Sequence, residues 1–474
     1  MAITPTETAS RWRRLPSIGP ASSYFGWGLA LVLFVLYAVS SIRAHQLLQT
    51  YGYDLGIFEQ VVRSYSEGRP GVTELKGPGF RQLGDHFTPA LILLAPFYRL
   101  FPSPITLLVA QSALMAVAVV PLVGWARRAL GTGPALVVGL GYGLSFGIAQ
   151  AVRFDFHEVA FAVPLVAMSL TALGERRMVA AAAWALPLLL VKEDLGLTVA
   201  AIGLLIAFYG ARRLGFAVAA AGVIGLVLVV TVFLPAMSPD GAYAYTSMVG
   251  GSADAMPLGQ YVREVLLAPV KLSTLFTTLA ITAFAALRSP LILVAVPTLA
   301  WRFAADKQEY WGIGYHYSAV LMPVLFAALI AALTRTRSVE APEGRRIMRV
   351  ELAVVAVVPL LLFPGTPLYQ TFRSETWRDD PRIAVARSIL GEIPDGVMVA
   401  ASNNLVPQLT NRTLTTLFGF PGLRPNPQWI VVDRLSPQGY PLNGEQRDKA
   451  LADAIAGGYQ VIRDEAGFIL LKRP

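Results

Sequence analysis

Long apolar runs recur along the chain and are separated by short polar junctions. A bilayer core of about 30 Å is crossed by a helix of roughly 20 apolar residues, and such runs recur until about residue 365. The pattern therefore predicts about eleven transmembrane helices. We expect them at residues 24–47, 105–126, 133–151, 157–174, 178–191, 195–211, 214–236, 272–287, 290–304, 316–334 and 347–365.

Two apolar stretches need a separate interpretation. Thr88–Phe101 is short and interrupted by prolines, and a full span there would break the alternation of junctions described next. We interpret it as an interfacial or re-entrant segment. The first run follows the basic stretch Arg11–Arg14, which also fits a cleaved signal peptide. Its length and the spans that follow favour an uncleaved first helix.

Every second junction between the predicted spans is short and basic. These junctions hold Arg127–Arg128, Arg176–Arg177, Arg212–Arg213, Arg288 and the cluster Arg335, Arg337, Arg345, Arg346 and Arg349. Short loops rich in Arg and Lys stay in the cytoplasm. We therefore expect a multi-pass protein of a bacterial cytoplasmic (inner) membrane, with the N-terminal tail 1–23 inside the cell.

Beyond Pro364 the long apolar runs give way to strand and helix patterns. Strands are predicted at 397–401, 429–433, 459–463 and 468–472, and helices at 382–390 and 444–456. The chain thus divides into the tail, a transmembrane domain at 24–365 with an extracytoplasmic loop at 48–104, and a small α/β domain at 366–474. The number of spans places this last domain outside the cytoplasm. It has no glycine-rich nucleotide motif.

Composition supports a membrane protein. Of the 474 residues, 55% are hydrophobic and only 15% are charged, whereas soluble proteins carry roughly a quarter charged residues. The net charge of +9 is explained by arginine pairs between apolar runs, so we expect no nucleic acid partner. The chain has no cysteine, which excludes disulfides, cysteine-ligated metals and cysteine nucleophiles.

The other set of junctions is rich in carboxylates, imidazoles and aromatic rings. Asp54 lies just after the first predicted helix and opens an amphipathic segment in which Phe58, Val61 and Tyr65 recur at helical spacing. An Asp at this place is a good helix N-cap. The alternative is a carboxylate held at the outer membrane surface and facing a site between lipid and water, and the residues alone leave both open.

Two further polar clusters fall on the same face. They are Asp85 with His86, and Asp155 with His157 and Glu158. Ionisable groups are costly inside lipid, so we expect these side chains to face a polar cavity. Ordinary loop residues at a membrane border are the alternative. Three clusters on one face, with nothing comparable on the other, favour a functional site.

Other residues of this face are candidates for substrate binding. Lys192, Glu193 and Asp194 form either a solvated hairpin or a charge cluster in which Lys192 holds a phosphate. His316 and Tyr317 are either aromatic-belt residues or contacts to a phosphate or sugar. Arg153, two residues before Asp155, is a candidate phosphate clamp, and Arg302 also lies near this face.

Asp155, His157 and Glu158 are also candidate ligands for a divalent cation, the one cofactor that the sequence suggests. Asp155 and His157 are two residues apart, a spacing that suits a loop and does not place both side chains on one helix face.

Five motifs in order resemble a known family. They are YDLGIFEQ at 53–60, GDHFTP at 84–89 followed by LAPFYRLFPSP at 94–104, DFHE at 155–158, KEDLGL at 192–197 and YHYS at 315–318. Together they resemble the bacterial membrane-protein family called domain of unknown function 2079, over about residues 24–365, and the residues leave open whether the resemblance extends over the C-terminal domain. That family is grouped with the GT-C glycosyltransferases.

The resemblance implies a GT-C-like fold and an activity. Enzymes of this superfamily transfer a sugar from a polyprenyl-phosphate carrier to an acceptor outside the cytoplasm, which here would be a cell-envelope glycan, lipid or protein. An acidic residue soon after the first helix is their catalytic base, and Asp54 matches it. Asp155 and Glu158 match a second acidic position. Several members have an acidic pair in the first loop, whereas here Tyr53 precedes Asp54.

Two other classes of function remain as alternatives. A secondary transporter also has many spans, but such proteins bind substrate near the bilayer midplane and often contain inverted repeats. Here the ionisable groups lie at one border. A non-catalytic envelope assembly protein would leave the Asp54 and Asp155–Glu158 clusters without a role.

Overall fold

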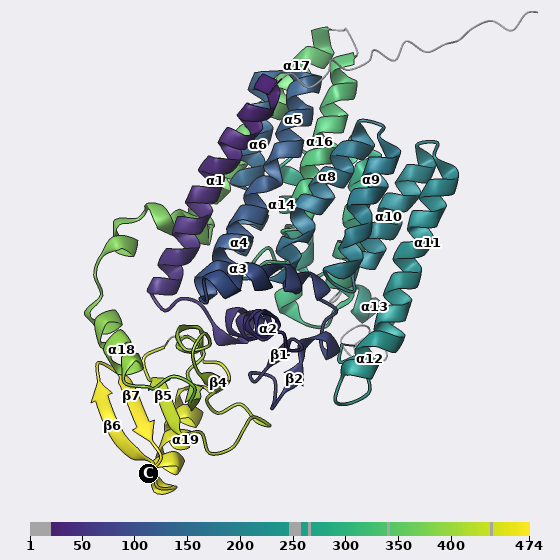
Figure 1. Cartoon of the computed structure of the whole chain (residues 1–474). Coiled ribbons are helices and arrows are strands. Elements are labelled where there is room, and N and C mark those ends of the chain that lie inside the picture. The colour runs from purple at the N-terminus through teal and green to yellow at the C-terminus, as the bar shows by residue number, and fades with distance from the viewer. Residues whose placement is uncertain (1–19, 246–256, 264–266, 339–341, 437–438) are drawn as a thin grey trace, which may run out of the picture.

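The computed structural model describes residues 20–245, 257–263, 267–338, 342–436 and 439–474. Most of the molecule is a bundle of helices, and a small sheet-containing domain lies at one end of it (Figure 1). The principal helices of the bundle are α1 (Pro20–Gln46), α4 (Pro104–Val117), α5 (Val119–Leu130), α6 (Thr132–Gly143), α7 (Phe146–Arg153), α8 (Ala162–Gly174), α9 (Met178–Ala185), α10 (Leu195–Phe208), α11 (Arg212–Leu228), α14 (Pro269–Ala280), α15 (Val296–Ala304), α16 (Leu321–Ser338) and α17 (Pro342–Leu362).

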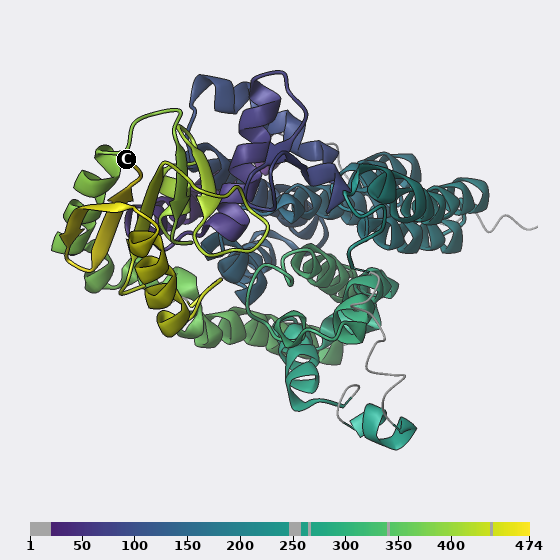
Figure 2. The same ribbon diagram turned by 90° about the horizontal axis from the view of Figure 1, so that it is seen from below.

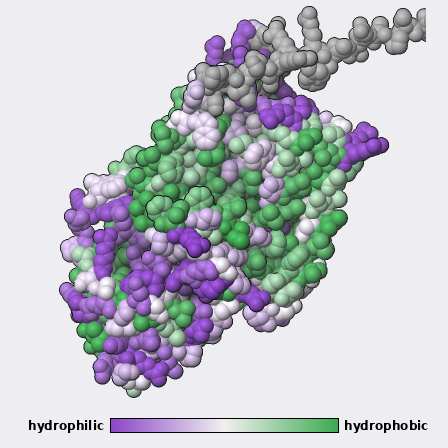
Figure 3. All heavy atoms as spheres, viewed as in Figure 1, coloured by the Kyte–Doolittle hydropathy of each residue, from purple (hydrophilic) through white to green (hydrophobic). Residues whose placement is uncertain are grey.

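Each predicted span coincides with one helix or with consecutive helical segments. By length and composition, four helices of the described chain are able to cross a membrane, or five when the bent pair α6–α7 is taken as one span. Several other predicted spans are short or broken apolar helices. Prolines explain some of the breaks, since Pro187 lies in the 3₁₀ segment η5 (Leu186–Leu190) after α9. On the face seen in Figure 3, a broad hydrophobic area covers the bundle.

Helix α16 lies at the centre of the bundle. Every residue from Leu321 to Ile330 is buried, and α16 packs against α5, α8 and α17. Helix α11 lies at the edge of the bundle, where Phe216 and Ile224 are exposed. This contrast is typical of a membrane protein, in which peripheral helices turn apolar side chains toward lipid.

Helices α10 and α11 approach each other through glycines. A Cβ atom on Gly203 would lie 2.4 Å from the backbone nitrogen of Ala219, and one on Gly215 would lie 2.2 Å from that of Ala207. Small residues allow such close helix packing where lipid removes the hydrophobic driving force.

We expect Gly203→Leu to destabilise the protein by roughly 1–3 kcal/mol, because the new side chain forces these backbones apart. Thermal unfolding in detergent measures the effect. Gly133→Leu is the matched control, since nothing lies within 4 Å of a Cβ atom at Gly133. Equal unfolding temperatures for the two variants would contradict this packing.

The basic junctions meet at the end of the bundle away from the sheet. Arg128 pairs with Glu175 (Nε–Oε1, 3.0 Å), Arg337 donates to the Ala129 carbonyl (2.8 Å), and Arg335 donates to the Arg288 carbonyl (3.2 Å). The alternation predicted from sequence therefore has a structural counterpart, with the basic junctions at one end and the acidic junctions at the other.

The loop between α1 and α4 forms several short elements. They are η1 (Gly52–Gly56), α2 (Ile57–Ser66), β1 (Val72–Thr73), β2 (Phe80–Arg81), η2 (Gln82–Gly84), η3 (Pro89–Leu94) and α3 (Ala95–Leu100). The predicted interfacial segment corresponds to η3 and α3, where Leu93, Phe97 and Leu100 are exposed. These apolar side chains lie on the outside of the segment, as membrane contact requires.

The C-terminal domain contains a five-stranded sheet with the order β4-β3-β5-β7-β6. Its strands are β3 (Met398–Ala401), β4 (Leu414–Leu417), β5 (Trp429–Asp433), β6 (Gln460–Glu465) and β7 (Phe468–Lys472), and its helices are α18 (Pro381–Gly391) and α19 (Gly444–Ala456). Strand β3 is parallel to β4 and β5, whereas β7 is antiparallel to β5 and β6. The sequence pattern missed β4 alone among these strands.

The loop and the C-terminal domain share one hydrophobic core. Leu48, Ile57 and Leu75 of the loop pack with Val399 and Leu470 of the sheet. Seen from below, the domain covers part of the bundle end next to the loop, and α10 and α11 lie at the far edge (Figure 2). The C-terminal domain therefore packs directly on the segment that carries Asp54.

Candidate active site

A cavity of about 350 Å³ lies where the acidic junctions meet the loop between α1 and α4. Its polar lining includes Gln82 and a larger set of five carboxylates, three lysines, three histidines and several aromatic side chains. They are Asp54, Asp85, Glu158, Glu193, Asp194, Lys76, Lys192, Lys307, His86, His157, His316, Tyr53, Tyr243, Tyr245, Tyr310, Tyr317 and Trp301. Nine of the eleven site residues expected from sequence are in this lining; Asp155 and Arg153 are not.

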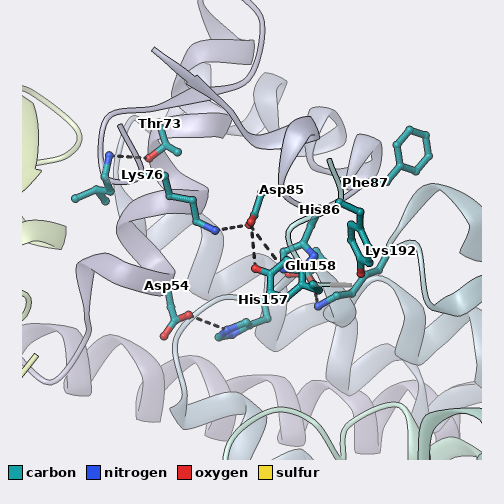
Figure 4. Close-up of polar contacts among 12 residues, drawn as sticks. Asp54, Thr73, Lys76, Asp85, His86, Phe87, His157, Glu158 and Lys192 are labelled. Carbon is teal, nitrogen blue, oxygen red and sulfur yellow. Dashed lines mark hydrogen bonds and ion pairs between the residues drawn. The ribbon is translucent and has the colours of Figure 1, made fainter. Parts of the chain in front are cut away.

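Asp54 lies in η1, a single turn of π-helix, an element that occurs often at functional sites. The N-cap position of α2 is Gly56, and no side chain caps that helix, so the N-cap interpretation of Asp54 is wrong. Its Oδ1 atom lies 3.3 Å from Nε2 of His157, and the two side chains point toward each other (Figure 4). The Asp54 side chain is 33% exposed.

Three other carboxylates of the cavity are buried in ion pairs. Lys76 pairs with Asp85, Lys192 Nζ lies 2.7 Å from Glu158 Oε1, and His86 Nδ1 lies 2.7 Å from Glu193 Oε1 (Figure 4 shows the first two). The carboxylate side chains are 8%, 2% and 3% exposed, respectively. Asp54 is thus more open than these three, and no Lys or Arg of the described chain pairs with it.

Neighbouring charges favour the ionised forms of Glu193, Asp85 and Lys192. Burial opposes ionisation of Glu193, but His86 and Lys192 outweigh it and lower its pKa to about 2. Burial likewise opposes the charge on Asp85, yet His86 and Lys76 lower its pKa. Burial also disfavours the Lys192 cation, but Glu158 and two neighbouring carboxylates raise its pKa. By contrast, burial raises the pKa of Asp194 to about 6 against the opposing effect of Lys192.

An aromatic wall forms one side of the cavity. The rings of His157 and His316 stack with centroids 3.6 Å apart, and Tyr317 packs on His316 at 4.2 Å. The buried guanidinium of Arg302 supports this wall, since it donates to the carbonyls of Tyr310 (2.8 Å) and Gly312 (2.6 Å). Arg302 therefore positions the wall and does not line the cavity.

Asp155 and Arg153 lie behind the cavity lining. Asp155 accepts a hydrogen bond at Oδ2 from the Tyr51 amide (2.8 Å), and its pKa is raised well above the usual range by burial and by the nearby Asp54. Arg153 donates to the Ser40 carbonyl in α1 (3.0 Å) and to Gln49 just after that helix (3.1 Å). Both residues fix the chain around Asp54, and Arg153 does not act as a clamp inside the cavity.

The three candidate metal ligands bind different partners. Asp155 accepts from Tyr51, His157 faces Asp54, and Glu158 pairs with Lys192. Within the ranges that the structure describes, no three such side chains are arranged to hold a metal ion. The residues present do not fit a divalent cation, and no chemical step below depends on one.

Sequence reasoning missed several residues of the lining. Lys76 lies between β1 and β2, and Tyr243 and Tyr245 follow α12 (Leu234–Met237). Tyr245 stacks on His86 at 4.6 Å and donates to Asp85 (3.1 Å). None of the three lies beside a cluster of ionisable residues, so position along the chain carried no signal. Only the fold brings them to the cavity.

The C-terminal domain holds the turn that carries Asp54. The Gly52 amide donates to the Asn403 carbonyl (2.8 Å), and the Tyr53 amide donates to Asn403 Oδ1 (3.0 Å). A Cβ atom on Gly52 would lie 2.5 Å from Cβ of Val406, so only glycine allows this contact. Two successive amides next to Asp54 thus take their acceptors from one residue of the domain.

The bundle of apolar helices, with a polar cavity at one end and a small sheet domain beside it, is that of a multi-span membrane protein with a GT-C-like fold. The family model described as "Predicted membrane protein (DUF2079)" matches residues 44–470. The chain belongs to this family, as the five motifs indicated.

Solved structures agree with this fold. The crystal structure of ArnT from Cupriavidus metallidurans bound to undecaprenyl phosphate is similar with a TM-score of 0.55 at 15% identity, over 96% of this chain and 98% of that chain. The apo structure of the same protein gives a TM-score of 0.52 at 14% identity, over 95% and 98%. No curated protein matches the sequence.

Proposed function

We propose that the protein is a membrane glycosyltransferase that moves a sugar from a polyprenyl-phosphate donor to an acceptor outside the cytoplasm. The observation that carries this proposal is the cavity with one open carboxylate, Asp54, beside three lysines. The similar ArnT fold, crystallised with undecaprenyl phosphate, supports a polyprenyl carrier. The basic end of the bundle supports an orientation with the cavity on the outer side.

In this proposal Asp54 is the catalytic base. It takes the proton of the acceptor hydroxyl as that oxygen bonds to the anomeric carbon of the sugar, and the bond from that carbon to the phosphate oxygen breaks. The polyprenyl phosphate leaves with the bonding electrons. His157, 3.3 Å from Asp54, orients the carboxylate. Among the carboxylates of the cavity, Asp54 suits this role because it is partly exposed and no Lys or Arg of the described chain pairs with it.

Positive groups stabilise the leaving phosphate as its charge grows. Lys192 and Lys76 are fixed by Glu158 and Asp85, so they contribute directed N–H groups and little net charge. Lys307 lies exposed in the cavity lining and has no ion pair within the described residues. We assign Lys307 to binding of the donor phosphate before transfer, a contact equally strong in the ground state and the transition state, which therefore acts on KM.

We therefore expect Lys307→Gln to raise the KM for the donor by about threefold to tenfold, with kcat little changed, because an exposed charge contact contributes modestly. The ratio of the KM of the variant to that of the wild type should decrease at high salt, because screening weakens the contact in the wild type. Steady-state kinetics at two salt concentrations measures both effects. Lys449→Gln, an exposed lysine on α19, is the control. An unchanged KM would remove Lys307 from the donor site.

The proposal is tested by incubating the purified protein in nanodiscs with polyprenyl-phosphate-linked sugars and measuring release of polyprenyl phosphate. Turnover that requires Asp54 supports the enzyme. Failure to turn over any of these donors, together with substrate counterflow in sealed vesicles, would instead support the transporter. The position of the ionisable groups at one end of the bundle argues against that alternative.

A further inference from the structure

A second cavity, of about 180 Å³, lies inside the C-terminal domain. Its lining includes residues at the carboxyl ends of two neighbouring parallel strands: Asn403 and Asn404 come shortly after β3, and Asp433 ends β5. The sides are formed by Phe418, Tyr440 and the start of α19. This cavity lies outside the lining of the candidate active site.

The topology of the sheet indicates that this position suits a ligand. The chain leaves β3 toward β4 on one side, and it leaves β5 toward α19 and the strands on the other side. The connections therefore diverge above the carboxyl ends of β3 and β5. In open α/β sheets, ligands bind in the crevice at such a switch point. The cavity lies in that crevice.

Two polar side chains that line the cavity are buried and hydrogen-bonded to each other. Asn404 is 6% exposed and Asp433 is 4% exposed. Asn404 Nδ2 donates to Asp433 Oδ2 (3.0 Å), while the buried Asn404 Oδ1 accepts no hydrogen bond from the described part of the chain. A buried acceptor without a donor is costly, so a ligand hydroxyl at this point would be stabilising.

The cavity suits a neutral ligand better than an anion. The two charged groups of its lining, Asp433 and Arg447, are already paired, with Arg382 (2.7 Å) and Asp448 (2.9 Å) respectively. The N-terminus of α19 is already capped, because Asn443 Oδ1 accepts from the Gln446 amide (2.9 Å). Amide and carboxylate groups beside the rings of Phe418 and Tyr440 match the hydroxyls and the apolar face of a sugar. The volume is below the roughly 300 Å³ of pockets for drug-sized ligands, which fits a single ring.

The cavity also contacts the turn that carries Asp54. Asn403, which lines the cavity, accepts both amide hydrogen bonds of that turn. The ring of Tyr440 packs on that of Tyr53 with centroids 5.1 Å apart, and Tyr53 lines the candidate active site. The two cavities thus share one wall.

We propose that this second cavity binds one ring of a neutral saccharide, and, given the proposed function, that this ring belongs to the acceptor glycan. The C-terminal domain then holds the acceptor next to the base that activates it. Of the three classes of acceptor considered, a glycan, a lipid and a protein, this site therefore favours a glycan.

Binding can be measured without the donor, so the result does not depend on turnover. Saturation-transfer-difference NMR is recorded on the full-length protein in nanodiscs with the methyl glycosides of glucose, galactose, mannose and N-acetylglucosamine. We expect at least one glycoside to bind, and Asn404→Ala to weaken its apparent affinity about tenfold through the lost hydrogen bond. Tyr440→Ala should weaken it similarly, whereas Tyr440→Phe, which keeps the ring, should not.

The variant Asp54→Asn distinguishes glycoside binding in the second cavity from binding in the candidate active site. Glycoside binding that survives Asp54→Asn and is weakened by Asn404→Ala supports the second cavity. No binding of any of the four glycosides by the wild type would overturn the proposal. Binding that is equally strong in Asn404→Ala and Tyr440→Ala, with thermal unfolding unchanged, would also overturn it. Tyr440 is 39% exposed, so its variants keep the test valid where Asn404→Ala fails to fold.

Discussion

Asp54→Asn is expected to lower kcat for sugar transfer by about 10²–10⁴-fold, the usual contribution of a positioned general base. The KM for the donor should change little, because Asp54 acts on the acceptor hydroxyl and the amide keeps the size of the side chain. We expect a large effect because three other carboxylates of the cavity are not available as a base: Asp85, Glu158 and Glu193 are each buried against a basic side chain.

The matched control for this variant is Asp395→Asn. Asp395 is an exposed carboxylate of the C-terminal domain that pairs with Arg412 (2.9 Å), far in sequence from the cavity lining. Both variants lose one carboxylate, and only Asp54→Asn should lose turnover. Full activity in Asp54→Asn would assign the base elsewhere, and Asp194, whose pKa is about 6, would be the next residue to replace.

Gly52→Ala should also lower kcat, by roughly 10²-fold. A misplacement of about 1 Å at a reacting group reduces the rate by that factor. The added methyl group would lie 2.5 Å from both Cβ and Cγ1 of Val406. The turn must then move away from the C-terminal domain, and Asp54 moves with it. Kinetics of the variant, with thermal unfolding to check the fold, measures the effect.

A second substitution tests this cause directly. Val406→Gly removes every atom of the Val406 side chain that meets the new methyl group, so the double variant Gly52→Ala/Val406→Gly should regain most of the lost kcat. Two such residues in contact should be strongly non-additive. A double variant as inactive as Gly52→Ala would show that the clash with Val406 is not the reason for the loss.

Hydrophobic periodicity and the positive-inside pattern were enough to predict the helical bundle and the gathering of acidic junctions at one end. Both depend on local sequence, since apolar length and flanking arginines act through the bilayer. Local sequence also indicated β3, β5, β6 and β7. It missed β4 (Leu414–Leu417), which is four residues long and contains only two apolar positions.

The candidate site was predicted in part for the same reason. Asp54, His157 and Lys192 belong to clusters that are visible in the chain, and the fold brings them together. Tyr245 carries no such signal. Lys307 has Asp306 and Glu309 beside it, but this run was not among the clusters that the sequence singled out. The sequence also could not distinguish a residue that lines the cavity from one just behind it, because Asp155 and Glu158 are three positions apart yet face different partners. That distinction depends on backbone geometry, and Asp155 has a left-handed φ of 57°.

The two amides beside Asp54 take their acceptors from Asn403, about 350 positions later in the chain. The ribosome synthesises residue 54 long before residue 403. During synthesis the membrane helices can therefore be inserted while the reaction centre is still incomplete. Given the proposed role of Asp54, its turn reaches the working geometry only when the C-terminal domain packs onto the loop between α1 and α4. We therefore expect a chain that lacks this domain to show no turnover.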